Sequence, residues 1–134
     1  MSIQDNIDGL NKFIPKYIGK RVTDPLGFYR GECVSLVKRF IKEMGWPMRR
    51  GNAKDWVNNG YEGYKYFKNT PKFVPTPGDI AIFNTGKYGH IGIVLVATIK
   101  SMDVLQQNDP IGSPVAIKKY NYVKPPSVGF LRKL

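Results

Sequence analysis

Three kinds of side chain in this sequence could together perform nucleophilic chemistry. Cys33, in the stretch RGECVSLVKRF, is the only cysteine of the chain. His90, in YGHIGIVL, is the only histidine, and two amides, Gln106 and Asn108, follow in VLQQND. A thiol that gives its proton to an imidazole, with the second ring nitrogen held by an amide, is an arrangement that performs acyl transfer.

Cys33 has two interpretations from its position alone. It stands where a helix is expected to begin, and the N–H groups and dipole of a helix N-terminus favour a thiolate. Free cysteine is also among the most buried residue types, and Cys33 shares the apolar face of that helix. A lone cysteine excludes an internal disulfide, and one cysteine with one histidine is too few for a Cys/His zinc site.

His90 and the two amides also have ordinary structural alternatives. His90 opens the most apolar strand candidate and could serve as general base and acid for Cys33, but a lone histidine is often only a structural residue. Gln106 and Asn108 lie two residues apart and face the same side of a strand, so either amide could accept from the ring N–H. The alternative is that both amides bond the backbone or water.

The elements that must position these residues are predicted to be helices first and strands later. Ser2 caps a helix from Ile3 to Asn11, limited by Pro15. Apolar periodicity predicts a helix from Glu32 to Met44 that stops at Gly45. Residues 23–30 form a turn-rich loop, 52–59 a short helix or turn and 61–69 irregular chain. Strands are predicted at 80–84, 90–99, 103–108, 115–123 and 128–133.

Composition limits the fold and the partners. A chain of 134 residues with 42% apolar side chains can form one ordered domain, and helices followed by strands predict an α+β fold with an antiparallel sheet. Twenty-one Lys and Arg against ten Asp and Glu give a net charge of +11, which attracts polyanions such as nucleic acid, anionic membranes or bacterial wall polymers. The alternative is that the basic charge only keeps the protein soluble and indicates no specific partner. We expect neither a secretory signal nor a membrane-spanning segment.

Five stretches in order resemble the CHAP family, the cysteine, histidine-dependent amidohydrolases and peptidases. They run from about Asp24 to Asn108 and read GECVSLVKRF, GNAKDW, PTPGDIAIF, GHIGIVL and VLQQN. The resemblance implies a papain-like fold, with N-terminal helices packed on an antiparallel sheet of about five or six strands. Residues 1–134 would form a single catalytic domain.

The resemblance also implies an activity and roles for the residues. The protein would hydrolyse an amide bond of peptidoglycan, either N-acetylmuramoyl-L-alanine or a bond within the stem or cross-bridge. Cys33 matches the nucleophile and His90 the base and acid, while Gln106 and Asn108 match the orienting groups. The N–H of Cys33 would stabilise the oxyanion. This chain departs from the family at Gln106, where many members have Glu, and at Glu32 in the oxyanion region, where many have Gln.

Some members of the family bind calcium in the loop before the cysteine. Asp24 remains here, but Leu26, Arg30 and Ser35 occupy positions that carry ligands in those members. Because calcium prefers several carboxylates among its oxygen ligands, we predict no metal at this loop and no cofactor.

The predicted partner is bacterial peptidoglycan, with anionic wall polymers as a further attraction for the basic surface. Tyr61, Tyr64, Tyr66 and Tyr88 are candidates for lining a substrate groove, although aromatic segments are as often packing. We expect a monomer with no nucleic-acid ligand, because the basic residues are dispersed and no recognition motif is present, and no stable membrane insertion.

Two further expectations concern the setting. The family suggests a phage lysin, made in the cytoplasm of an infected bacterium and released to the wall through a holin, or carried on the virion. The alternative to an enzyme is a catalytically silent CHAP-like module that binds the wall without cleaving it.

Overall fold

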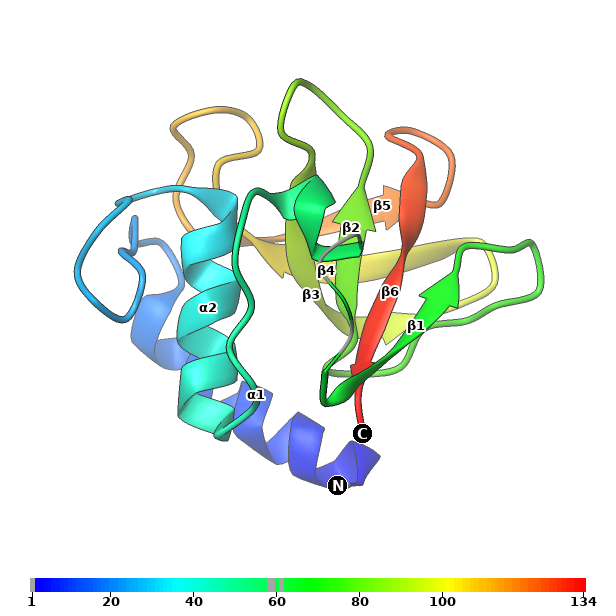
Figure 1. Cartoon of the computed structure of the whole chain (residues 1–134), viewed down its shortest axis with the longest axis horizontal. Helices are drawn as coiled ribbons and strands as arrows, with labels where there is room; N and C mark the ends of the chain where they lie inside the picture. The colour runs from blue at the N-terminus through cyan, green and yellow to red at the C-terminus, as the bar shows by residue number, and fades with distance from the viewer. Residues whose placement is uncertain (1, 58–59, 61) are drawn as a thin grey trace.

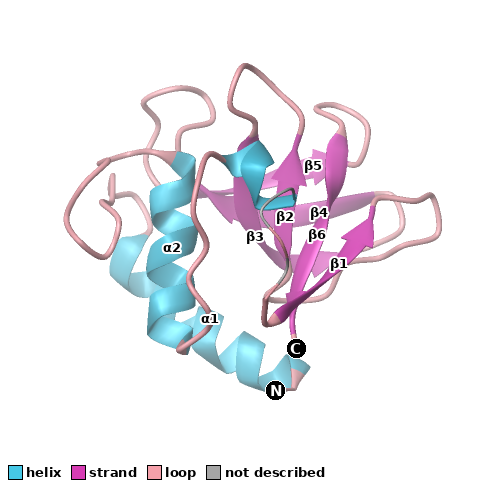
Figure 2. Cartoon of the chain, in the orientation of Figure 1, coloured by secondary structure: helices cyan, strands magenta, loops and turns pink. Residues whose placement is uncertain are grey.

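In the computed structural model, two helices lie against one face of an antiparallel sheet (Figures 1 and 2). The structure describes residues 2–57, 60 and 62–134. The helices are α1 (Ile3–Tyr17), α2 (Cys33–Met44) and the short 3-10 helix η1 (Ala53–Val57). The strands in the described chain are β1 (Tyr64–Lys68), β2 (Ile80–Phe83), β3 (His90–Ala97), β4 (Ser101–Gln106), β5 (Ala116–Asn121) and β6 (Ser127–Lys133). The predicted α+β class and antiparallel sheet are confirmed.

The strands lie in the order β1-β6-β2-β3-β4-β5. Every neighbouring pair is antiparallel, and β3 runs between β2 and β4 near the middle of the sheet. His90 is the first residue of β3 and pairs with Phe83, the last residue of β2. The base candidate therefore lies at the end of a central strand, paired there with β2, while the pairing of β3 with β4 begins at Ile93.

Helix α1 is longer than the sequence predicts. Ser2 Oγ accepts from the Asp5 N–H at 3.1 Å and the Asp5 carboxylate accepts from the Ser2 N–H at 3.0 Å, which forms the capping box. The predicted end at Asn11 is wrong, because the helix continues through Pro15 to Tyr17. Burial of Phe13 against the core favours the added turn, and a proline there removes only one helical hydrogen bond.

Helix α2 holds its place through a fully buried apolar face, formed by Leu36, Val37, Phe40 and Ile41. It ends at Gly45, whose φ of 72° is the left-handed conformation that glycine adopts without strain. The helix begins at Cys33, and Glu32 is its N-cap residue, within one residue of the predicted start. The Glu32 side chain makes no capping hydrogen bond.

One strand was not expected. Residues 64–68 form β1, which pairs with β6 in register from Tyr64 opposite Lys133 to Lys68 opposite Gly129. The prediction of irregular chain is wrong here, because the strand is stabilised by a partner more than sixty residues away that no local pattern indicates. The predicted strand at 103–108 also shifts, to 101–106.

The core has two parts, one on each face of the sheet. The first lies between the helices and the sheet and includes Phe13, Leu36 and Ile93. The second lies on the other face, where Phe83, Tyr120 and Phe130 pack together. The sheet curves, so that β4 and β5 pass behind β2 and β6 in the view of Figure 2. This curvature places Tyr120 of β5 within 4.6 Å of the Phe83 ring, measured between centroids.

Among the helices of the described residues, none combines the length and apolarity needed to cross a membrane.

Candidate active site

Cys33 is the first residue of α2 and is held there by the loop before it. The Gly31 N–H donates to the Val22 oxygen at 2.9 Å, and the Glu32 N–H donates to the Tyr29 oxygen at 3.2 Å. Gly31 has a φ of 82°, and a Cβ there would collide with the Arg21 side chain. These contacts fix the direction in which the chain enters the helix, and they leave the Cys33 side chain 9% exposed.

His90 is held at the start of β3 by the turn before it. Gly89 has a φ of 78°, and a Cβ there would lie 3.0 Å from the Phe83 oxygen and the Lys54 nitrogen, so this position needs glycine. The imidazole is 5% exposed and packs against the rings of Phe83 and Tyr120, at centroid distances of 5.8 and 6.2 Å.

Cys33 and His90 line the same cavity, which has a volume of about 370 Å³. Glu32, Asn108 and Asp109 also line it, together with the loop 85–89 and Ile111. The structure therefore brings together the thiol, the imidazole and one of the two predicted amides, from segments far apart in the sequence.

Both reactive groups are neutral near pH 7. Burial raises the pKa of the Cys33 thiol to about 11, outweighing the N–H groups of Ile91, Val34 and Cys33 itself, which lower it, and the Glu32 carboxylate raises it further. Of the two interpretations of Cys33, the preference for a thiolate at the helix start is opposed by burial, which has the larger effect on its pKa. Burial also lowers the pKa of His90, against opposing effects of Asp109 and Gln106.

The two predicted amides behave differently. Gln106 is buried beside His90 and raises the pKa of the imidazole, yet its Oε1 completes no hydrogen bond of normal geometry. Asn108 has a φ of 73°, and its Oδ1 accepts from the Gly112 N–H at 2.7 Å. The Asn108 amide thus stabilises its own turn at the cavity wall.

Between these two residues, Gln107 is fully buried and forms three hydrogen bonds. Its Oε1 accepts from the Val22 N–H at 3.0 Å, and its Nε2 donates to the oxygens of Val22 at 3.0 Å and Glu32 at 2.7 Å. No role for this residue was predicted from the sequence. It joins the segment after β4 to the residue that precedes the nucleophile.

Three other residues that the sequence did not indicate form a hydrogen-bonded group next to His90: Tyr120, Asp109 and Lys118. The Tyr120 hydroxyl lies 3.4 Å from His90 Nε2 and donates to Asp109 Oδ2 at 2.6 Å. Lys118 also donates to Asp109 Oδ2, at 3.0 Å. Alternation along β5 could have placed Lys118 and Tyr120 on one face, but no sequence pattern indicates that this face meets His90.

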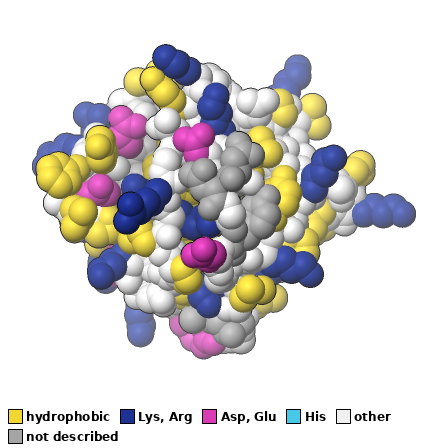
Figure 3. Space-filling model, viewed as in Figure 1, with side chains coloured by type: hydrophobic (Ala, Val, Ile, Leu, Met, Phe, Trp, Pro, Cys, Tyr) yellow, Lys and Arg dark blue, Asp and Glu magenta, His cyan; other side chains and the backbone are white. Residues whose placement is uncertain are grey.

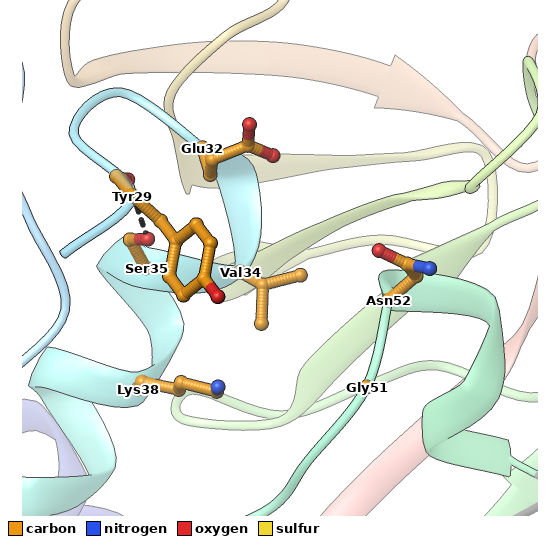
Figure 4. A pocket seen from close by; sticks show the side chains of 7 residues that line it. All are labelled: Tyr29, Glu32, Val34, Ser35, Lys38, Gly51 and Asn52. Carbon is orange, nitrogen blue, oxygen red and sulfur yellow. Dashed lines mark hydrogen bonds between the residues drawn. The ribbon is translucent and has the colours of Figure 1, made fainter.

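A second cavity, of about 270 Å³, adjoins the first and shares Glu32 with it. In Figure 4 the Tyr29 ring lies between the Glu32 carboxylate and the Lys38 ammonium, with Asn52 facing them. Tyr29 has a φ of 54°, a strained conformation for a bulky residue. The main-chain oxygen of Tyr29 accepts a hydrogen bond from Ser35 Oγ at 2.7 Å. Glu32, the residue before Cys33, therefore lines both cavities.

The tyrosines predicted to line a groove are dispersed. Tyr88 lines the cavity of Cys33 and is exposed. Tyr64 is buried and donates to the Pro47 oxygen at 2.6 Å, and Tyr66 donates to the Val128 oxygen at 3.2 Å, so β1 keeps both away from the cavity. Tyr61 lies outside the described residues.

The loop before Cys33 does not fit a calcium ion. The Asp24 carboxylate already accepts from the N–H groups of Leu26 and Phe28, both at 3.0 Å. The Arg39 guanidinium donates to the Thr23 oxygen at 2.8 Å and to the Asp24 oxygen at 3.0 Å. Two main-chain oxygens of this loop are therefore already bound by a positively charged side chain. The described residues contain no group of three His, Cys, Asp or Glu side chains that could hold a metal.

Basic side chains are dispersed on one face of the molecule. Lys and Arg side chains are scattered over the face shown in Figure 3, with fewer acidic side chains between them. This distribution suits general attraction to an anionic polymer better than a shaped nucleic-acid site.

Comparison with known proteins gives a consistent picture. Residues 23–108 match the family model of the CHAP domain. The chain is 35% identical over 96 residues to endolysin LysK of Staphylococcus phage K, and 36% identical over 105 residues to endolysin PlyTW of Staphylococcus phage Twort. These alignments cover 63% and 69% of this chain but only 19% and 22% of the endolysins, so the chain spans about a fifth of the curated relatives it matches.

Solved structures share the fold. The crystal structure of endolysin LysIME-EF1 superposes with a TM-score of 0.75 at 22% identity, covering 99% of this chain and 64% of that one. The structure of Ly7917, described with the hydrolysing product of MDP, gives a TM-score of 0.69 at 14% identity and covers 98% of this chain and 63% of that one.

Proposed function

The chain belongs to the CHAP domain family, and from this premise we propose that it is a cysteine-dependent peptidoglycan hydrolase of the phage lysin kind. The observation that carries the proposal is that the only cysteine and the only histidine line one cavity. The bond cleaved is an amide, either the bond between N-acetylmuramic acid and L-alanine or a bond within the stem peptide or the cross-bridge of peptidoglycan.

The proposed reaction begins from a neutral pair. His90 takes the Cys33 proton as the sulfur attacks the carbonyl carbon, since burial keeps the thiol protonated until substrate arrives. The tetrahedral intermediate expels the amine, which receives that proton from His90. Water, deprotonated by His90, then hydrolyses the thioester and restores the thiol.

The oxyanion of the intermediate needs hydrogen-bond donors near Cys33. The Cys33 N–H at the start of α2 is in the right place, and the helix dipole adds to its effect. A carboxylate at Glu32 offers no donor, and this side chain is exposed and makes no hydrogen bond or ion pair with the other described residues. The backbone therefore acts as the donor, and Glu32 is a neighbour that slows the reaction.

The cavity of Cys33, lined by Tyr88, and the cavity of Tyr29, which shares Glu32 with it, would hold the peptide part of the wall. The excess of Lys and Arg would concentrate the protein on stem carboxylates and wall polyphosphates. We further propose that it acts as a monomer without nucleic acid, cofactor or stable membrane insertion.

The similarity to two staphylococcal phage endolysins supports the setting expected above. The protein would be made in an infected bacterium and reach the wall through holin-type release, or be carried on the virion.

The raised pKa of Cys33 and the neutral Gln106 favour one alternative, a silent module that binds walls without cleaving them. Purified staphylococcal walls test both, with turbidity and released amines as readouts and a sedimentation assay for binding. We expect the wild type to clear walls and both Cys33→Ala and Cys33→Ser to bind without clearing them. Equal clearing by all three proteins would disprove the hydrolase, and binding without clearing by all three would establish the silent module.

A further inference from the structure

We infer that Tyr120 and Asp109 are the residues that position His90 as the base, taking the place of the carboxylate that Gln106 lacks. This inference rests on the proposed function in one respect, the use of His90 as the base. The Tyr120 oxygen accepts from the Nε2–H of the imidazole, and Asp109 fixes the hydroxyl and supplies the negative charge.

The geometry of the three groups supports this chain. The Tyr120 oxygen lies 2.6 Å from Asp109 Oδ2 and 3.4 Å from His90 Nε2, so it stands between the carboxylate and the ring. The Tyr120 side chain is only 3% exposed, which leaves few alternative positions for its hydroxyl. Lys118 donates to the same carboxylate oxygen and holds Asp109 toward the phenol.

The tautomer of the imidazole follows from where the single hydroxyl hydrogen of Tyr120 points. A phenol has one hydrogen, and the short contact to a carboxylate is the stronger of its two interactions, so the hydrogen points to Asp109. Tyr120 therefore presents only a lone pair to His90. Nε2 must carry the ring hydrogen to interact favourably, and Nδ1 is left with the free lone pair that a base requires.

The negative charge of Asp109 stabilises the imidazolium that forms when His90 takes the proton of Cys33. Four titratable groups lie around the ring: Cys33 on α2, Asp109 after β4, and Tyr120 and Lys118 on β5. Three further titratable residues line the cavity into which the ring faces: Glu32, Lys87 and Tyr88. Burial lowers the pKa of His90, Asp109 raises it and Lys118 lowers it. The pKa of Asp109 is itself lowered: burial raises it, but the hydrogen bonds from Tyr120 and Lys118 prevail, so the carboxylate is ionised at neutral pH. The imidazolium is therefore stabilised through the phenol by a carboxylate that remains ionised.

The predicted amides do not supply this negative charge, although Gln106 also raises the pKa of His90. The Gln106 amide is neutral, and the Asn108 oxygen is engaged by Gly112. Tyr120 and Asp109 come from the edge strand β5 and the loop that leads to it, eleven residues apart, and meet at the ring only because the strands pair.

The test uses the fact that His90 is the only histidine, so nitrogen-15 NMR of histidine-labelled protein reads one imidazole. We expect the Nε2–H tautomer in the wild type. Tyr120→Phe should mix in the other tautomer, and both Tyr120→Phe and Asp109→Asn should lower the pKa of His90. Tyr122→Phe and Asp103→Asn are matched controls, since Tyr122 bonds the Thr98 oxygen and Asp103 pairs with Lys119, both away from the ring.

On walls, Tyr120→Phe should reduce kcat at least about tenfold with KM unchanged, and shift the acid limb of kcat/KM to lower pH. An Nδ1–H tautomer in the wild type, or variants that lose activity without any change in tautomer or pH profile, would overturn the inference. The NMR result needs no substrate. If walls are not cleaved but the tautomer and pKa respond as expected, the hydrolase fails while the positioning of His90 stands.

Discussion

Gln107 donates to the main-chain oxygen of Glu32 at 2.7 Å, so the segment after β4 is bonded directly to the residue before the nucleophile. The same side chain forms two further hydrogen bonds with the backbone of Val22. One buried amide therefore sets the distance between the N-terminus of α2 and the end of the strand that borders β3.

Replacing this amide should destabilise the fold. Gln107→Met keeps the length of the side chain but removes three hydrogen bonds and leaves the buried Val22 N–H without a partner, at about 1–3 kcal/mol for that group. The Val22 and Glu32 oxygens keep one donor each, the N–H groups of Gly31 and Ser35. We expect the free energy of unfolding, measured in urea, to fall by about 3 kcal/mol. Gln4→Met, on the exposed face of α1, is the matched control and should change it by less than about 0.5 kcal/mol. Equal effects of the two substitutions would contradict this role.

Cys33 should react slowly with iodoacetamide. Because the thiolate is the reactive form and the pKa is raised to about 11, labelling near neutral pH should be at least about tenfold slower in the folded protein than in urea. Glu32→Gln removes a carboxylate that raises this pKa, so the labelling curve should move to lower pH. Folded protein that reacts as fast as the unfolded chain would show that a preformed thiolate is present.

Gln106→Glu should raise the pKa of His90, because a carboxylate beside the ring favours the imidazolium. Burial holds this pKa below its ordinary value in the wild type, so the neutral base persists below pH 6.5. The acid limb of kcat/KM should therefore move to higher pH in the variant, as measured on walls across the acid range. Gln4→Glu, the same change on exposed α1, should leave the limb in place, and a shift to lower pH in Gln106→Glu would refute the prediction.

Calcium should neither stabilise nor activate the protein. An ion whose free concentration is about one hundred times its Kd would add about 2.7 kcal/mol to the free energy of unfolding of a protein that binds it only when folded. We expect the melting temperature and the rate of wall clearing to be the same in millimolar calcium and in chelator. Asp24→Ala should lower the melting temperature equally in both, since it removes the acceptor of two N–H groups. A calcium-dependent rise that Asp24→Ala abolishes would reveal a site.

Much of the fold could be predicted because its signals are local. The apolar face of α2, Gly45 at its end and the β-branched runs of β2 and β3 each act within a few residues. Strand β1 was missed because its stability comes from pairing with β6. The final turn of α1 was missed because the burial of Phe13 outweighs the presence of Pro15.

The candidate site, like the fold, could be predicted only where its signals are local. Cys33 and His90 could be selected by residue type and by motif, and the structure places both in one cavity. Tyr120 and Asp109 could not, because nothing in the local sequence shows that a tyrosine of β5 reaches over a neighbouring strand to the end of β3. The charge state of Cys33 also depends on burial by the whole fold, which a helix position alone does not reveal.

The place of β5 at the edge of the sheet has a thermal consequence. An edge strand is hydrogen-bonded to one neighbour, and local opening at such a place costs less free energy than global unfolding. When β5 detaches from β4 on warming, Tyr120 leaves the imidazole while α2 and the central strands remain folded. Wall-clearing activity should then fade at a lower temperature than the one at which the helical circular dichroism signal melts.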